Sequence, residues 1–276
     1  MALLAVKQPD LPGAVDALAA WPGILVLTVQ NGIGAEELVA ARRGEAGLVA
    51  ASLTASVELA EDGSVRWLRR GGIGLAAVSG DVATAIGELR AAFASAGLPA
   101  AILPDARAMK WSKLLANLTG NATSAVLDMD PAAVYRDRRL FSIERRQFRE
   151  AVDVMRRLGL RPVALPGADV PLLLRGFALP GRIGGPLMAI ALGGARGGKM
   201  PSLRLAVRRG SGPTEAAWLN GAVAAAARGL GMMAPVNACL SELVDQAASD
   251  ARRRDWFRGR PDRLLEALDV QASTMA

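Results

Sequence analysis

The 276-residue sequence contains no histidine and only one cysteine. The absence of histidine excludes Ser-His-Asp and Cys-His catalytic triads, histidine-based zinc sites and a histidine general base. The single cysteine, Cys239, excludes an internal disulfide bond and a cysteine metal cluster. We therefore expect no metal site, and any proton chemistry must rely on Lys, Asp, Glu, Tyr or this cysteine.

Long apolar runs and aromatic residues are also scarce. No stretch of about 18 consecutive apolar residues occurs, and the first residues form no signal peptide, so we expect a cytoplasmic protein without a membrane span. Hydrophobic residues make up 51% of the chain but aromatic residues only 4%. This composition favours closely packed helices and buried parallel strands over an aromatic-rich β-sandwich.

The chain has a net charge of +7 and a sequence pI of about 10.6. Such a charge is compatible with a nucleic acid, a membrane surface or an anionic substrate as partner. The basic residues, however, occur as scattered pairs with acidic residues between them, and no aromatic platform accompanies them. We therefore expect a solvated, arginine-rich surface and no nucleic-acid partner.

The sequence changes character near residue 105. Before this point, short apolar runs alternate with helical segments; the expected strands are 3–7, 24–30, 49–59, 64–68, 74–78 and 100–103, and the expected helices are 10–20, 36–43 and 84–96. After it, helical periodicity dominates, at about 107–119, 130–158, 169–175, 214–229, 235–248 and 261–271, with short helices and loops in 176–213. The pattern predicts an α/β domain with a parallel sheet over residues 1–105 and a helical domain over residues 106–276.

The most informative motif is a set of polar residues spaced by four in an apolar helix: Lys113, Asn117 and Asn121. If the helix continues through all three, they stack along one face, while neighbouring Leu residues pack inward. An amine and two carboxamides suit a small polar ligand, because lysine donates a proton or a charge and asparagine both donates and accepts. A solvated helix face explains the spacing equally well.

Polar residues also follow the first two expected strands. Lys7 closes the first strand, and Gln30-Asn31-Gly32 follows the second. In open α/β sheets ligands bind at the carboxyl ends of strands, and glycine there lets the backbone approach a ligand closely. A simple strand-to-helix turn is the alternative.

Two further motifs lie in the helical part. Thr214-Glu215 opens an expected helix, with Thr214 as its cap, and capping explains Glu215 about as well as catalysis does. Pro201-Ser202 follows a glycine-rich stretch.

Taken in order along the chain, these residues resemble the ketopantoate reductase family (2-dehydropantoate 2-reductases). The resemblance rests on Lys7, Gln30-Asn31-Gly32, Trp111-x-Lys113-x3-Asn117-x3-Asn121, Pro201-Ser202 and Thr214-Glu215-x4-Asn220-Gly221. It implies a Rossmann-type sheet followed by a helical domain that binds substrate and forms a homodimer. It also implies the NADPH-dependent reduction of a 2-oxo acid, 2-dehydropantoate to pantoate, on the route to coenzyme A.

The resemblance assigns a role to each residue. Lys113 is the general acid, which fits the expectation that a nearby ammonium stabilises a developing alkoxide. The residues implied to bind the substrate are Asn117, Asn121 and Ser202. The residues implied to bind the cofactor are Lys7, Asn31, Gly32 and Glu215.

The sequence departs from the family pattern at its start. Members begin with a strand and a Gly-x-Gly-x-x-Gly turn roughly 65 residues before the position of Lys7, so we expect a truncated Rossmann-type sheet or a start upstream of Met1. Ala206 and Pro131 replace an acidic residue and an asparagine found in other members. The alternative function is therefore a non-catalytic family member whose helical domain dimerises without binding NADPH.

Overall fold

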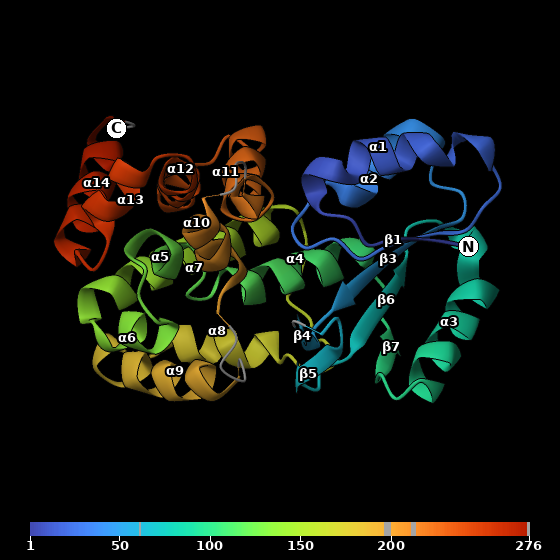
Figure 1. Cartoon of the computed structure of the whole chain (residues 1–276), viewed down its shortest axis with the longest axis horizontal. Coiled ribbons are helices and arrows are strands. Elements are labelled where there is room, and N and C mark those ends of the chain that lie inside the picture. The colour runs from blue at the N-terminus through green and yellow to red at the C-terminus, as the bar shows by residue number, and fades with distance from the viewer. Residues whose placement is uncertain (61, 196–199, 211–213, 275–276) are drawn as a thin grey trace. The chain divides into compact units, whose positions relative to one another are not determined.

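The computed structural model describes residues 1–60, 62–195, 200–210 and 214–274 (Figure 1). The chain divides into two compact units. The first unit comprises Met1–Ala116 and Leu160–Pro171, and the second comprises Asn117–Gly159 and Leu172–Ala276. The division falls within helix α4 (Ala106–Leu118). The expected domains, 1–105 and 106–276, stay a prediction.

The first unit contains a five-stranded sheet in the order β1-β2-β3-β6-β7. Its strands are β1 (Ala2–Leu4), β2 (Val26–Thr28), β3 (Leu48–Leu53), β6 (Ile73–Ala77) and β7 (Ala100–Ile102). The predicted α/β class, with a mainly parallel sheet, is confirmed.

One pairing within this mainly parallel sheet is antiparallel, that of β3 with β6. A parallel pair needs a crossover connection, usually a helix. In its described residues, this connection holds the two-stranded hairpin of β4 (Ser56–Leu59) and β5 (Val65–Arg69) and no helix, so the chain returns in the opposite direction. The strand predicted over 49–59 is accordingly divided into β3 and β4.

Helices cover both faces of this sheet (Figure 1). Adjacent residues of β2 point to opposite faces: Val26 packs in the cluster with α1 and α2, and Leu27 packs in the cluster with α3. Burial on both faces explains why this strand reads as a continuous apolar run. The helical elements of the first unit are η1 (Gln8–Asp10), α1 (Leu11–Asp16), η2 (Ala17–Ala20), α2 (Ala35–Arg43), η3 (Gly80–Val82) and α3 (Ala83–Ser95).

The second unit is helical in its described residues, as predicted for this part of the chain. The helix predicted over 130–158 breaks at Asp137, whose carboxylate accepts hydrogen bonds from the first backbone N–H groups of α7. The helices are α5 (Ala122–Leu127), α6 (Pro131–Arg136), α7 (Arg138–Arg157), α8 (Val170–Ala178, which begins in the first unit), α9 (Gly181–Ala195), α10 (Ser202–Arg209), η4 (Glu215–Trp218), α11 (Asn220–Gly229), α12 (Pro235–Ser249), α13 (Ala251–Phe257) and α14 (Pro261–Thr274).

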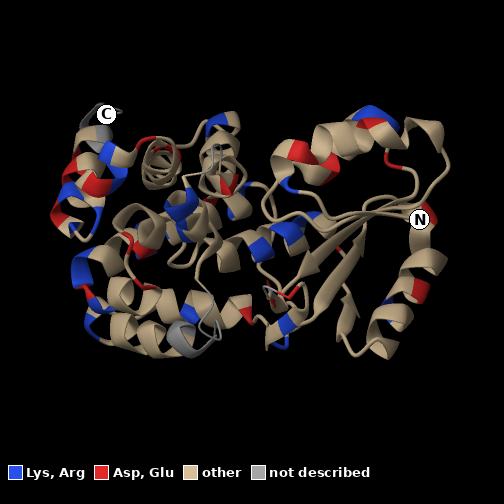
Figure 2. Ribbon diagram, viewed as in Figure 1, with Lys and Arg blue, Asp and Glu red and all other residues tan. Residues whose placement is uncertain are grey.

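Charged residues of both signs are interspersed along the outer helices, for example along α13 and α14 (Figure 2). In the described parts of the chain, no helix combines the length and apolarity that a membrane crossing requires. The basic composition is thus spread over mixed-charge helices.

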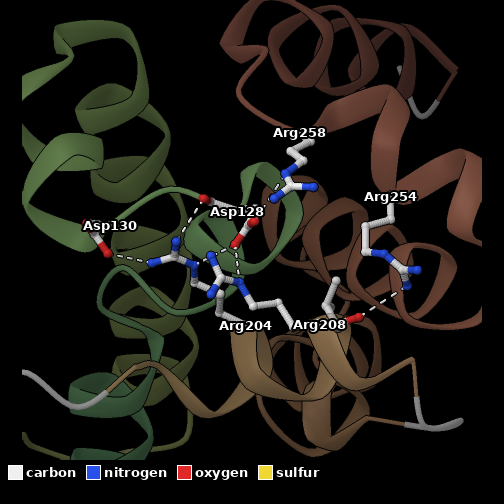
Figure 3. A network of polar contacts seen from close by, with 7 residues as sticks. Asp128, Asp130, Arg204, Arg208, Arg254 and Arg258 are labelled. Carbon is white, nitrogen blue, oxygen red and sulfur yellow. Dashed lines mark hydrogen bonds and ion pairs between the residues drawn. The ribbon is translucent and has the colours of Figure 1, made fainter.

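A charged network joins three helices of the second unit around Asp128 (Figure 3). Asp128 ends α5 in a left-handed conformation (φ 50°, ψ 36°), and its side chain is only 10% exposed. Its Oδ1 accepts hydrogen bonds from Nε of Arg204 at 2.8 Å and Nε of Arg208 at 2.7 Å, and its Oδ2 lies 3.3 Å from Nε of Arg258. Because these arginines belong to α10 and to the end of α13, one carboxylate fastens both helices to α5.

The network also shifts the titration of this carboxyl group. Burial alone would raise the pKa of Asp128, but the hydrogen bonds from Arg208 and Arg204 outweigh it and hold the pKa below its ordinary value. The ionised group therefore stabilises the fold above the unfolded-state pKa of about 3.9, and this contribution is lost as the pH falls through the folded-state pKa.

We expect Asp128→Asn to lower the free energy of unfolding by about 2 kcal/mol near neutral pH. Asparagine tolerates the left-handed backbone, but its amide carries no negative charge to pair with the arginines. As the pH is lowered toward about 2, the difference between variant and parent should shrink, because the parent carboxylate loses its charge as the pH falls through its folded-state pKa. Urea denaturation at both pH values measures this difference. A difference that does not change with pH would contradict the role of the charge.

Candidate functional site

The turn after β2, residues Gln30–Gly32, is fixed by polar contacts within the first unit. The buried Gln30 side chain donates through Nε2 to the carbonyl oxygens of Leu4 at 2.8 Å and Val6 at 3.1 Å. Gly32 adopts φ 85°, which favours glycine, and the exposed Asn31 lies between these two residues. The Gln30 side chain therefore fixes the turn to the neighbouring segment of the chain, while Asn31 is exposed to solvent.

Lys7 lies beside this turn, in the segment that follows the neighbouring strand β1. The strand itself is shorter than predicted: β1 ends at Leu4, and the Gln30 side chain binds the carbonyl oxygens of Leu4 and of Val6 beyond it. The next residue, Gln8, donates through Nε2 to the carbonyl oxygen of Asn31 at 2.9 Å. The structure thus brings the exposed Lys7 and the Gln30–Gly32 turn to the same edge of the sheet.

Lys110, on α4, is a buried charged residue that the sequence analysis overlooked. It is 4% exposed. Its Nζ donates to the carbonyl oxygens of Gln30 at 2.6 Å and Ala51 at 3.4 Å, and lies 3.1 Å from Oε1 of Glu36. A signal for it exists in the sequence, since Lys110 precedes the buried Leu114 by four residues and therefore lies on the apolar face of α4.

Glu36 completes this arrangement from the first turn of α2. Its Oε1 also accepts a hydrogen bond from Oγ1 of the fully buried Thr28 at 2.6 Å. Beside the pair of Glu36 and Lys110 lies a cavity, whose apolar lining includes Ile33, Val78 and Trp111. The pair thus connects α4 with β2 and α2.

Lys113 and Asn117 lie one turn apart on α4, as the spacing predicted. Both side chains are partly exposed, whereas Leu114, Leu115 and Leu118 are fully buried. The helix therefore separates a polar face from an apolar face at these positions. An ammonium group can donate a proton, and a carboxamide can hold a polar ligand.

Asn121 does not continue this helical face, so the expectation of a three-residue stripe on one helix is wrong. Helix α4 ends at Leu118, Gly120 turns with φ 56°, and Asn121 precedes α5. Asn121 is 5% exposed, and its Oδ1 accepts a hydrogen bond from the backbone N–H of Leu203 at 3.2 Å. It thereby binds the start of α10, directly beside the exposed Ser202.

A buried carboxylate on α7 explains why α4 ends where it does. Glu144 is fully buried. It accepts hydrogen bonds from the backbone N–H of Gly120 at 2.6 Å, Oγ1 of Thr123 at 2.6 Å and the hydroxyl of Tyr135 at 2.9 Å. A Cβ at position 120 would also lie 3.1 Å from the Tyr135 ring. Glu144 therefore holds the turn that places Asn121.

Glu215 lies in the first turn of η4 and is partly exposed. The predicted cap is confirmed, because Oγ1 of Thr214 accepts a hydrogen bond from the N–H of Ala216 at 3.0 Å. The helix predicted over 214–229 is interrupted at Leu219. Asn220, which follows, is fully buried and donates through Nδ2 to other buried side chains, so it packs inside the second unit.

The lone cysteine and the lone tyrosine offer no free acid or nucleophile. Burial, and then the nearby Glu242, raise the pKa of Cys239 to about 12, which keeps it a thiol. Tyr135 is 1% exposed and donates to Glu144. Of the residue types that the sequence left for proton chemistry, lysine and the carboxylates remain.

The family models described as "Ketopantoate reductase PanE/ApbA" and "Ketopantoate reductase PanE/ApbA C terminal" match residues 1–80 and 105–248. A 2-dehydropantoate 2-reductase of Halobacterium salinarum is 27% identical over 135 residues, which are 49% of this chain and 45% of that protein. The matched part is thus less than half the length of that curated relative.

Solved structures share the fold. A PanE/ApbA family ketopantoate reductase from Ralstonia eutropha is 25% identical, with a TM-score of 0.73, over 91% of this chain and 76% of its own. D-mandelate dehydrogenase, in a ternary structure with NADH and anilino(oxo)acetate, is 18% identical, with a TM-score of 0.75, over 92% of this chain and 76% of its own.

Proposed function

Because this chain belongs to the ketopantoate reductase family, we propose that it serves the NADPH-dependent reduction of a 2-oxo acid, 2-dehydropantoate to pantoate. The observation that carries the proposal lies on α4. A partly exposed lysine, Lys113, precedes a partly exposed asparagine, Asn117, by one turn, on a helix tied through Lys110 to the Gln30–Gly32 turn. NADPH, when bound, would supply the hydride.

Lys113 is the proposed general acid. Its ammonium gives a proton to the carbonyl oxygen of the 2-oxo acid as hydride adds to the carbonyl carbon, so the products are a 2-hydroxy acid and a neutral amine. The ammonium also stabilises the negative charge that develops on oxygen before the proton moves. We propose that Asn117, Asn121 and Ser202 hold the hydroxyl and carboxylate of the substrate, which carboxamides and a hydroxyl suit.

The proposed cofactor residues are Lys7, Asn31, Gly32 and Glu215. Support comes from the strand ends of the first unit, where Lys7 and Asn31 are exposed and Gly32 leaves the turn without a side chain. A lysine there can pair with phosphate, and a carboxamide can bridge cofactor and substrate. A nicotinamide cofactor is also supported by the similar D-mandelate dehydrogenase, whose structure is a complex with NADH.

The organisation of the protein belongs to the same proposal. We propose that residues 1–105 form the cofactor domain and residues 106–276 the substrate domain, that the helical domain forms a homodimer, and that the protein works in the cytoplasm on the route to coenzyme A.

The test uses the protein expressed from its full reading frame, including any coding sequence upstream of Met1. We expect 2-dehydropantoate to drive the oxidation of NADPH, followed by absorbance, faster than other 2-oxo acids do, and NADPH to act more efficiently than NADH. A dimer that binds neither cofactor and turns over no 2-oxo acid would overturn the proposal in favour of the non-catalytic alternative.

A further inference from the structure

The ion pair of Lys110 and Glu36 in the first unit belongs to a larger set of polar contacts. The ammonium of Lys110 has three acceptors: the carbonyl oxygens of Gln30 and Ala51 and the carboxylate of Glu36. An ammonium has three N–H donors, so its hydrogen-bonding capacity is filled. Side chains of this kind are rarely fully buried unless they are paired.

Two partners of Lys110 lie in or next to the Gln30–Gly32 turn, which contains proposed cofactor residues. Gln30 begins the turn that contains Asn31 and Gly32, and its 2.6 Å bond to Lys110 is the shortest contact of the ammonium. Glu36 lies in the first turn of α2, directly after this turn. Lys113, the proposed acid, follows Lys110 by three residues and thus by nearly one turn of α4.

Comparison with an apolar residue at position 110 shows what the lysine provides. A buried ion pair is often no more stabilising than well-packed apolar residues of the same size. Position 110 lies on the apolar face of α4, where a leucine or methionine would pack without desolvating a charge. A charged group there does what an apolar group cannot: it binds a backbone carbonyl at a defined distance and direction.

We propose that Lys110 is a positioning residue for the proposed reduction. By holding the Gln30 carbonyl and the Glu36 carboxylate, it fixes the part of α4 that carries Lys113 relative to the Gln30–Gly32 turn. This inference rests on the proposed function. A misplacement of about 1 Å between reacting groups can cost about 100-fold in rate, so the loss of this tether acts on turnover.

The experiment compares Lys110→Met with the double variant Lys110→Met/Glu36→Met. The single variant leaves the Glu36 side chain, which is only 12% exposed, without its cation. The double variant replaces the whole pair by apolar residues and should recover most of the stability against urea. Arg107→Met is the matched control, because it removes an exposed cation one turn earlier on the same helix.

We expect kcat to fall about 10- to 100-fold in both Lys110 variants, while the Kd for NADPH changes less than about threefold. Amide hydrogen exchange at residues 31–35 should accelerate about tenfold in both, since the turn loses its anchor. The control should match the parent in all three measurements.

Each outcome decides the proposal. A double variant with recovered stability and parental kcat would show that Lys110 serves stability alone and would overturn it. A change in NADPH affinity that accounts for the lost turnover would also contradict it. If the parent protein reduces no 2-oxo acid, the proposed function fails, and amide exchange still decides the tether: unchanged exchange in Lys110→Met overturns it, and faster exchange supports it.

Discussion

Replacing Lys113 by alanine is expected to lower kcat for the 2-oxo acid about 10²- to 10⁴-fold, with little change in the Kd for NADPH. The alanine removes both the proton donor and the positive charge that stabilises the developing alkoxide. It leaves the apolar face of α4 intact, because Lys113 is partly exposed while the neighbouring Leu114 and Leu115 are fully buried. The loss should therefore lie in chemistry and not in folding.

Steady-state kinetics and a separate cofactor titration measure the two effects. Arg107→Ala is the control on the same helix, since its side chain is exposed and is not one of the proposed site residues. Added primary amines should restore part of the turnover of Lys113→Ala if the missing group is a proton donor. If Lys113→Ala turned over substrate as fast as the parent, Lys113 would not be the general acid.

The largest effect on stability is expected from Glu144→Ala, which should lower the free energy of unfolding by about 3 kcal/mol or more. The substitution leaves three donors, on Gly120, Thr123 and Tyr135, without their buried acceptor. Unsatisfied buried polar groups are costly because the low-dielectric interior offers no replacement.

Urea denaturation with the parent and with Asp153→Ala on the same helix tests this prediction. Asp153 pairs with Arg156 on the exposed side of α7, so its loss should change the free energy by less than about 0.5 kcal/mol. Glu144→Gln keeps one acceptor and the side-chain volume, and should give an intermediate loss if Glu144→Ala does not fold. Equal stability of Glu144→Ala and Asp153→Ala would contradict the role of the buried carboxylate.

The sequence predicted those features that depend on residues close together in the chain. The run around β2 is apolar because both of its faces are buried, and that alone indicated a strand within an α/β sheet. The four-residue spacing of Lys113 and Asn117 similarly indicated one helix face. These features follow from the periodicity of strands and helices, which a sequence shows directly.

Contacts between distant residues were not predictable in this way. Helix α4 stops before Asn121 because Glu144, 24 residues beyond Gly120, takes the N–H of that glycine. The four-residue spacing of the asparagines gives no indication of this contact. The antiparallel pairing of β3 and β6 likewise depends on the hairpin between them, and the role of Lys110 depends on a carbonyl 80 residues away.

The buried thiol of Cys239 has a consequence for labelling chemistry. Alkylating reagents react with thiolates, and a thiol whose pKa is about 12 supplies almost none near neutral pH. Since the chain has one cysteine, a second one introduced at the exposed position 107 would be the site that a maleimide dye modifies in the folded protein. A fluorophore placed there would report on α4 beside Lys110 and Lys113 without any prior removal of native cysteines.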